Sequence, residues 1–268
     1  LPFKLTNAQE RTIKEISDDI SLTKPMRRLV QGDVGSGKTV VAAVSMYISA
    51  KNDTQSVLLC PTEVLAEQHF KNFSAWFKNS NIKIELLTGK MPVSKRRGIY
   101  QDLEDGVIDI LIGTHAVFQD KVKMKNLGLV VVDEQQRFGV KQRFDLVKKS
   151  SDQIMPHQLF MTATPIPRTL AMTIFADLET SKIDELPPGR KPVETLVYSD
   201  KKKDEIVKRL ETVCKSGNQV FWLCTMIEES ENLDVQAADE AKEWIKENTN
   251  GLNIGLVHSK LSKDQRDK

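Results

Sequence analysis

A glycine-rich stretch near the start of the chain has the residue types and spacing that bind phosphate. It matches the pattern G-x-x-x-x-G-K-[ST], and its residues are Gly32, Asp33, Val34, Gly35, Ser36, Gly37, Lys38 and Thr39. Glycines allow successive backbone N–H groups to point at phosphate oxygens, and the first turn of a following helix adds partial positive charge. In this pattern the lysine reaches the β- and γ-phosphates, and the threonine hydroxyl is a ligand of Mg²⁺. The stretch therefore predicts a nucleoside triphosphate site with Mg²⁺, with a glycine-rich turn that binds nothing as the alternative.

Two acidic residues provide the second half of such a site. Asp133 and Glu134 follow directly after the apolar run Leu129–Val132, so both are expected at the end of a buried strand. Asp133 is predicted to hold Mg²⁺ through water, and Glu134 to orient or deprotonate the attacking water. With Lys38 they form the predicted catalytic group. These residues alone do not distinguish a kinase, a GTPase, a transporter ATPase and a helicase, although the chain lacks the N-K-x-D sequence of a guanine reader.

Short apolar runs alternate with amphipathic stretches, and these are the elements expected to position the site. Such alternation is typical of a doubly wound parallel sheet in an α/β protein. The predicted strands are Arg28–Gln31, Ser56–Cys60, Lys83–Leu87, Ile108–Ile112, Gly128–Asp133 and Gln158–Thr162. The predicted helices are Lys38–Ala50, Glu63–Asn79, Pro92–Asp105, Val140–Lys149 and Pro167–Phe175.

The alternation is interrupted at residues 186–192, where Pro187 and Pro188 precede Gly189. Adjacent prolines remove backbone donors and fix φ, so we interpret this segment as a linker. Residues 1–185 then form a complete nucleotide-binding domain, and residues 193–268 form part of a second α/β domain. In the second part we expect strands at Glu194–Tyr198, Gln219–Cys224 and Asn253–His258, and helices at Lys202–Lys215 and Val235–Glu247.

Composition narrows the class of protein. The chain has 268 residues and a formal net charge of +2, which neither favours nor excludes a nucleic-acid partner. Its three cysteines include no C-x-x-C pair, so a disulfide framework or zinc ribbon is not expected. We therefore expect the protein to lie in the reducing cytoplasm. The four histidines show no metal-ligand spacing, and no apolar segment is long enough to cross a membrane.

Further motifs resemble those of superfamily 2 helicases and occur in that family's order. They are the Q motif Leu5–Gln9, the strand-contacting motifs Pro61–Leu65 and Gly113–His115, the D-E-x-x box Asp133–Gln136 and the coupling motif Thr162–Thr164. The resemblance narrows to the RecG family of branch-migrating DNA helicases at Asp133–Arg143, Met161–Met172, Ile183–Arg190 and Cys224–Ser230. It covers nearly the whole chain and implies a RecA-like P-loop NTPase domain followed by a partial second RecA-like domain.

The resemblance implies roles for residues outside the phosphate loop. Gln9 would read the adenine edge, and Phe3 would lie against the adenine ring, although Phe3 could instead be a core residue. Thr162 and Thr164 would couple the state of the γ-phosphate to domain movement, together with Gln136. Threonine is also favoured at strand ends, which is the alternative for the two threonines.

The resemblance also implies contacts with the DNA backbone. The residues concerned are Thr62, Thr114 and His115, and His115 could instead cap the segment 117–118. Basic runs that could add phosphate contacts are Lys90 with Lys95–Arg97, Arg137 with Lys141 and Arg143, and Lys201–Lys203. Such contacts would not read the base sequence, and a solvated helix surface is the alternative for each run.

The chain departs from the family in two respects. The family's D-E-x-x box usually ends in His, whereas Gln136 keeps a donor and an acceptor but carries no charge, so we expect coupling of altered strength. The chain also ends before the family's later motifs, which supply arginine fingers worth about 10³–10⁵ in rate. We therefore expect a monomer that binds Mg–ATP and DNA, hydrolyses ATP poorly and unwinds nothing by itself.

The leading interpretation is an ATP-dependent helicase or translocase that remodels branched DNA. Within the superfamily the alternatives are a transcription-repair coupling translocase, which shares the stretches Arg137–Val140 and Pro165–Leu170, and an RNA helicase. The alternative of another class is a nucleotide-switched DNA-binding module that never translocates. The presence of Glu134 favours the enzyme over that module, because a protein that only binds and releases nucleotide does not need a base for hydrolysis.

Overall fold

The chain divides into two compact units, Leu1–Lys191 and Pro192–Lys268. The computed structural model describes residues 1–134, 155–164, 178–185, 193–224 and 231–257, and of residues 200 and 231–237 it describes the backbone alone. The predicted linker 186–192 and the predicted helices Val140–Lys149 and Pro167–Phe175 lie outside the described residues. Each unit is described below by itself.

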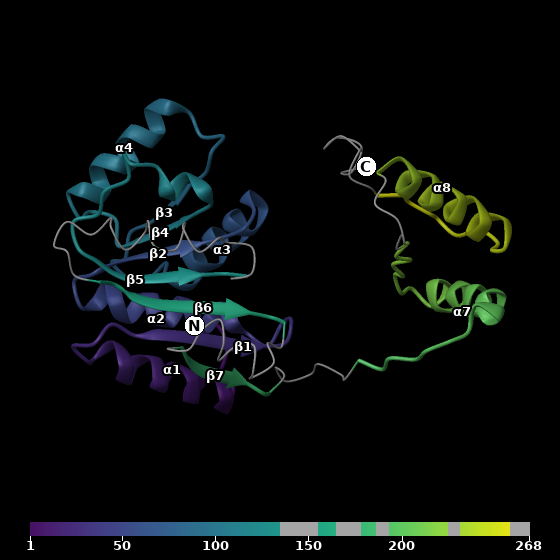
Figure 1. The fold of residues 1–268 in the computed structure, drawn as a ribbon, viewed down its shortest axis with the longest axis horizontal. Helices are drawn as coiled ribbons and strands as arrows, with labels where there is room; N and C mark the ends of the chain where they lie inside the picture. The colour runs from purple at the N-terminus through teal and green to yellow at the C-terminus, as the bar shows by residue number, and fades with distance from the viewer. Residues whose placement is uncertain (135–154, 165–177, 186–192, 225–230, 258–268) are drawn as a thin grey trace. The chain divides into compact units, whose positions relative to one another are not determined.

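The first unit is built on one sheet of seven parallel strands (Figure 1). The strands are β1 (Arg27–Gly32), β2 (Gln55–Leu59), β3 (Ile84–Leu87), β4 (Ile110–Gly113), β5 (Leu127–Val132), β6 (His157–Thr162) and β7 (Glu179–Ile183). Their order across the sheet is β3-β4-β2-β5-β6-β1-β7, from top to bottom in Figure 1. Because all strands are parallel, all of their carboxyl ends lie at one edge of the sheet.

Helices cover both faces of this sheet. They are α1 (Asn7–Ile20), α2 (Lys38–Lys51), α3 (Glu63–Trp76), α4 (Val93–Glu104) and the short 3₁₀ helix η1 (His115–Phe118). Side chains of α1, α2 and α3 share one apolar core with Leu129 and Val131 of β5, whereas α4 and η1 share a second core with Val130 and Val132. Successive side chains of β5 therefore enter opposite cores, so the strand is buried on both faces, as expected for a parallel sheet.

The prediction of a doubly wound parallel α/β fold is confirmed for this unit. All six predicted strands form, and so do the predicted helices at 38–50, 63–79 and 92–105, with small displacements at their ends. Strand β7 was not predicted, because only Ser181 and Ile183 of this polar edge strand are buried and no apolar run marks it. Helix α1 was not predicted either, although the capping box formed by Thr6 and Gln9 was a usable signal.

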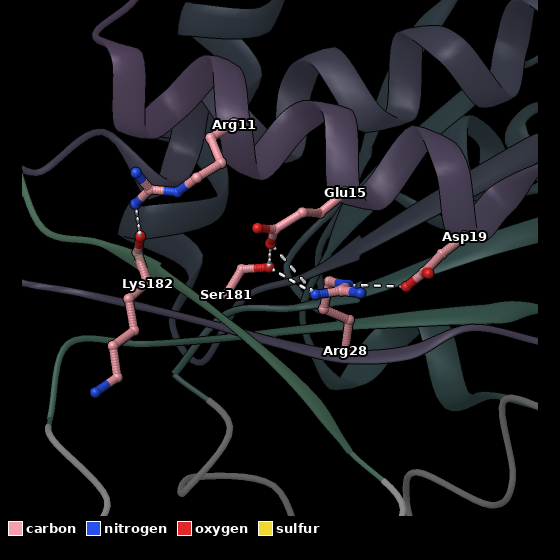
Figure 2. Close-up of polar contacts among 6 residues, drawn as sticks. All are labelled: Arg11, Glu15, Asp19, Arg28, Ser181 and Lys182. Carbon is pink, nitrogen blue, oxygen red and sulfur yellow. Dashed lines mark hydrogen bonds and ion pairs between the residues drawn. The ribbon is translucent and has the colours of Figure 1, made fainter.

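A polar network joins α1 to the edge of the sheet, as Figure 2 shows. Arg28 of β1 is 8% exposed, and its guanidinium donates to Asp19 Oδ2 and to Ser181 Oγ, each at 2.8 Å. Glu15 Oε2 lies 3.4 Å from Arg28 Nη1 and also accepts a hydrogen bond from Ser181. A buried guanidinium requires such partners, because an unpaired charge is costly to bury. The network therefore fixes α1 against β1 and β7.

The second unit contains α7 (Lys203–Lys215) and α8 (Glu231–Glu247), and a short 3₁₀ helix, η3 (Asp200–Lys202), precedes α7. Both α-helices were predicted. The predicted strands at 194–198, 219–224 and 253–257 are not strands in the structure, so these predictions were wrong. A strand requires a neighbour that pairs its N–H and C=O groups, and Val197 and Phe221 remain 95% and 94% exposed. None of the helices described in either unit is long and apolar enough to span a bilayer.

Candidate nucleotide-binding and catalytic site

Three neighbouring strands bring the predicted nucleotide-binding residues to one edge of the sheet. Strand β6 pairs with β5 on one side and with β1 on the other, so the segments that follow these three strands are neighbours. From β1 the chain continues to β2 on one side of the sheet, and from β6 it continues to β7 on the other. In open α/β sheets, ligands bind where the connections diverge in this way, outside the carboxyl ends of the strands.

The loop between β1 and α2 has the backbone geometry of a phosphate cradle. Gly35 and Gly37 have φ values of +75° and +90°, in the left-handed region that glycine adopts without strain. Gly32 is packed so closely that a Cβ atom there would lie 2.5 Å from Ser36 Oγ. Gly37 directly precedes α2, whose first residues are Lys38 and Thr39, so the unpaired N–H groups of the first helical turn adjoin the loop.

The ammonium group of Lys38 spans this loop. Its Nζ donates to the carbonyl oxygens of Gly32 at 2.7 Å and Asp33 at 2.9 Å. Burial lowers the pKa of Lys38, while the carboxylates of Glu134, Asp133 and Asp33 act in the opposite direction. Lys38 is therefore within electrostatic reach of the acidic pair after β5. An ammonium group has three donors, so it can exchange the loop carbonyls for phosphate oxygens.

The acidic pair stands where β5 ends. Asp133 N donates to Leu59 O at 2.9 Å, which continues the pairing between β5 and β2. The side chain of Asp133 is hydrogen-bonded to His69, with 3.1 Å between Asp133 Oδ2 and His69 Nε2. Glu134 has a φ of +51°, a left-handed conformation that is uncommon for a residue with a side chain and concentrates at functional sites. The chain therefore turns sharply at the residue predicted to act on the attacking water.

Thr39 and Asp133 supply oxygen donors of the kind that Mg²⁺ prefers. Among the residues that the structure describes, no group of three or more His, Cys, Asp or Glu side chains could hold a metal ion. Mg²⁺ is commonly bound by one or two carboxylates together with the phosphates of a substrate, so it needs no such group. The donor set therefore fits Mg²⁺ bound together with a nucleotide.

Two of the predicted coupling residues, Thr162 and Thr164, lie at the end of β6, the strand between β5 and β1. Thr162 Oγ1 lies 2.9 Å from Thr164 Oγ1, and Thr164 N donates to Thr162 Oγ1 at 3.2 Å. Gln31 of β1 is paired in register with Thr162, and its Nε2 donates to Thr164 O at 3.3 Å. The two threonines thus form a hydrogen-bonded turn that is tied to β1 immediately before the phosphate loop. Gln136, the third predicted coupling residue, lies outside the described residues.

Gln9 connects α1 to the phosphate loop. Its Oε1 accepts from Thr6 N at 3.0 Å, and its Nε2 donates to Ser36 O at 2.9 Å. The side-chain amide therefore holds the loop, a contact that the sequence interpretation did not include. Phe3 is 44% exposed and packs edge-on against Trp76 with the ring centroids 5.7 Å apart, so the alternative of a core residue is wrong.

The residues predicted to contact DNA follow β2 and β4, on the other half of the same sheet edge. These strands pair with each other, which brings the segments after them together. Thr62 caps α3, because its Oγ1 accepts from Leu65 N at 3.3 Å. Thr114 is 7% exposed, whereas His115 is exposed and begins η1. The N-cap of η1 is Thr114, so the alternative role of His115 as a cap is wrong.

One of the predicted basic runs lies close to Thr62. Lys90, which follows β3, places its Nζ 2.8 Å from Glu63 Oε2 in the first turn of α3. The hydrogen bond from Lys90 lowers the pKa of Glu63. Lys90 is therefore neutralised in part by this ion pair. The run Arg137, Lys141 and Arg143 lies outside the described residues.

Two residues at the site were not predicted from the sequence. Gln31 is a polar residue near the end of β1, and His69 is the polar member of the buried stripe that it forms with Ala66 and Phe73 on α3. The available signal was a polar side chain at a position that faces the protein interior. Such a group requires a hydrogen-bond partner, but the sequence does not say which partner it has.

Known proteins resemble this chain in sequence and in fold. The sequence matches the family described as DEAD/DEAH box helicase over residues 6–173. The ATP-dependent DNA helicase RecG of Haemophilus influenzae is 48% identical over an alignment 268 residues long, which covers 99% of this chain and 39% of that protein. The ATP-dependent DNA helicase RecG of Escherichia coli K12 is 49% identical over 263 residues, 97% of this chain and 38% of that protein. A solved structure of RecG bound to a three-way DNA junction has a TM-score of 0.77 and 38% identity, and the match covers 92% of this chain and 32% of that one. The chain thus spans between 32% and 39% of the length of these relatives.

Proposed function

The chain belongs to the DEAD/DEAH box helicase family, and on that premise we propose that it is the ATP-binding motor part of an ATP-dependent DNA helicase of the RecG type. The proposed work is the remodelling of branched DNA, such as replication forks and recombination intermediates. Support comes from the similarity to RecG proteins along nearly the whole chain and from the layout of the nucleotide site. Residues 193–268 are proposed to be part of a second RecA-like domain, joined to the first by the linker at 186–192.

One observation carries the proposal: the ends of β1, β5 and β6 are adjacent and bear complementary groups. Lys38 lies within electrostatic reach of Asp133 and Glu134. The turn of Thr162 and Thr164 lies at the end of β6, the strand between β1 and β5. Hydrolysis of a nucleoside triphosphate requires a phosphate cradle, an acidic group for Mg²⁺ and a group that orients the attacking water. Residues of the types suited to these three requirements stand at the ends of neighbouring strands, which supports the proposal.

Each residue of the site then has its own task. The N–H groups of residues 35–39 and the ammonium of Lys38 bind the β- and γ-phosphates. Thr39 and Asp133 hold Mg²⁺, directly or through water, and the bound ion neutralises the phosphate charge. Glu134 orients the attacking water and accepts its proton.

The remaining residues of the site bind the base and respond to hydrolysis. Gln9 contacts the adenine edge while it holds the loop through Ser36 O, and Phe3 lies against the adenine ring. The turn of Thr162 and Thr164 responds to loss of the γ-phosphate, because it lies between the strands that precede the phosphate loop and the acidic pair. Gln136 completes the proposed coupling group.

DNA is proposed to bind along the half of the sheet edge that bears Thr62, Thr114 and His115. The Thr62 hydroxyl accepts a hydrogen bond from Leu65 N, so its own O–H can donate to a phosphate oxygen. The start of α3 adds partial positive charge at the same place. Contacts of this kind hold the backbone and do not read the bases.

Nucleotide binding by the 268-residue chain tests the first half of the proposal. Isothermal titration calorimetry with Mg–ADP should show one site per chain. Lys38→Met should weaken this binding about 10-fold or more, because a hydrogen bond to a charged group contributes about 1.5–3 kcal/mol. Lys51→Met, at the other end of α2, is the matched control and should bind as the wild type does. Absence of binding by the wild type, or equal affinities of the two variants, would overturn the proposal.

DNA binding and slow turnover test the second half. Fluorescence anisotropy with forked DNA, linear duplex and RNA should show the highest affinity for forked DNA. A preference for RNA would favour an RNA helicase, and equal binding of forked and linear DNA would favour a transcription-repair translocase. If the chain is part of a motor, it should hydrolyse ATP slowly, and Glu134→Gln should abolish this hydrolysis. A nucleotide-switched module should not hydrolyse ATP, with or without the substitution.

We further propose that the chain is a monomer that acts in the cytoplasm. The cytoplasmic location is supported by Cys60, Cys214 and Cys224, which are all free thiols in the structure, as suits a reducing compartment. Burial raises the pKa of the Cys60 thiol well above its usual value, and the nearby carboxylate of Asp133 acts in the same direction. Cys60 is therefore an inert core residue under the conditions of these assays.

A further inference from the structure

A histidine outside the motifs described above is hydrogen-bonded to the carboxylate proposed to hold Mg²⁺. His69 Nε2 lies 3.1 Å from Asp133 Oδ2, and the two side chains are 8% and 14% exposed. An ionised carboxylate can only accept hydrogen bonds, so the tautomer of His69 with its proton on Nε2 is the one that donates to Asp133. The backbone of Asp133 is held as well, by the bond from its N to Leu59 O at 2.9 Å. Both the main chain and the side chain of Asp133 are therefore fixed.

Packing alone would favour an apolar residue at the position of His69. On α3 it lies in the buried stripe between Ala66 and Phe73, both of which are fully buried. His69 Nδ1 is also buried, and it has no hydrogen-bond partner among the residues that the structure describes. A buried nitrogen without a partner disfavours folding, so a leucine would pack here at lower cost. The bond to Asp133 is the interaction that accounts for a histidine.

We propose that His69 is a positioning residue that orients the carboxylate of Asp133 for Mg²⁺ and thereby links the metal site to α3. The inference rests on the proposed function, because it assumes that Asp133 serves Mg²⁺. With Oδ2 engaged by His69, Oδ1 remains to serve the metal, and rotation of the carboxylate is restricted. Hydrogen-bond partners of metal-binding side chains contribute about 10–100-fold to metal affinity.

Helix α3 connects this bond to the proposed DNA contact. Thr62 caps the helix, and His69 follows roughly two helical turns later within the uninterrupted helix Glu63–Trp76. A displacement of the first turn by a bound phosphate backbone would therefore be transmitted to His69. The two sites should then be energetically coupled, and by linkage the coupling must be reciprocal.

The test compares nucleotide affinity with and without Mg²⁺ in the 268-residue chain. His69→Leu removes the donor and keeps an apolar side chain, whereas His69→Gln keeps an N–H donor at the same number of bonds from Cα. Calorimetric titration with ADP, once in Mg²⁺ and once in EDTA, gives two Kd values. The Kd in EDTA divided by the Kd in Mg²⁺, called the Mg²⁺ ratio below, measures the contribution of the metal to ADP affinity. We expect His69→Leu to reduce this ratio about 10-fold or more at unchanged Kd in EDTA, and His69→Gln to retain most of it.

His157→Gln is the matched control. His157 is half-buried, less buried than His69, and its side chain is also hydrogen-bonded to the protein, since Nδ1 accepts from Met26 N at 3.0 Å. It is the first residue of β6 and thus lies at the opposite edge of the sheet from the site. This substitution should lower the thermal stability and leave the Mg²⁺ ratio unchanged.

The outcomes distinguish failure of this inference from failure of the proposed function. If the wild-type chain binds no ADP in Mg²⁺, both fail. If it binds ADP, but His69→Leu keeps the Mg²⁺ ratio or weakens binding equally with and without the metal, only the role of His69 is overturned. The link through α3 is measured by the change in Kd for Mg–ATPγS when forked DNA is added. It fails if that change is absent in the wild type or equally large in His69→Leu.

Discussion

Replacing Arg28 with Met would show how firmly α1 is held against the sheet. The guanidinium of Arg28 is bonded to Asp19, Glu15 and Ser181, and the residue is 8% exposed (Figure 2). Methionine keeps an unbranched apolar stem and removes the charge and all of its donors. Two carboxylates on α1 then lose their counter-charge, and the contact between α1 and β1 is weakened.

The magnitude follows from how deeply the partners are buried. Removing one partner of a fully buried ion pair costs about 3–5 kcal/mol. The side chains of Glu15 and Asp19 are 39% and 23% exposed, so water can solvate them once the guanidinium is gone. We therefore reduce the expected loss to about 2–3 kcal/mol for the first unit. In a domain of this size the loss corresponds to a Tm lowered by about 4–12 °C.

Differential scanning calorimetry measures this loss. The transition of the first unit is identified by its upward shift on addition of Mg–ADP, because a ligand that binds the folded state stabilises it. Arg11→Met is the control, since Arg11 and Asp184 also form an ion pair at 2.8 Å but are 49% and 65% exposed. Such exposed pairs often contribute nothing measurable. If both variants had the same Tm, burial would not determine how much these two ion pairs contribute to the free energy of unfolding, and the reasoning would be refuted.

Two further substitutions test the phosphate loop and the strand beside it. Gly37→Ala would place a Cβ atom 2.2 Å from Gln9 Nε2 at a φ of +90°. Backbone strain of about 1–3 kcal/mol at this position should weaken ADP binding about 5-fold or more in calorimetric titrations, and wild-type affinity would contradict this. Thr162→Val keeps the shape of the side chain and removes the hydroxyl that bonds to Thr164. ADP affinity should then stay close to that of the wild type while single-turnover ATP hydrolysis slows, and an unchanged rate would remove Thr162 from the coupling group.

The nucleotide site is a proposal that the sequence already suggests, because the chemistry it requires is local in the sequence. The phosphate loop consists of consecutive residues, and its glycines, lysine and threonine each have a requirement that few other residues meet. The run Leu129–Val132 predicts a buried strand by its apolar character, and the acidic pair directly follows it. The alternation of such runs with amphipathic stretches was sufficient to predict six of the seven strands of the sheet in the first unit, but not the polar edge strand β7. Strand propensity was not sufficient at 194–198 and 219–224, because a strand also requires a partner.

Only the tertiary structure decided which distant side chains meet. Gln9 contacts Ser36, His69 contacts Asp133 and Arg28 contacts Ser181, across sequence separations of 27, 64 and 153 residues. Periodicity indicates that a residue faces the interior, but it does not indicate which element lies opposite. That depends on the order β3-β4-β2-β5-β6-β1-β7 and on the register between neighbouring strands. Order and register are set by the packing of all the elements together, so no single segment of the sequence contains them.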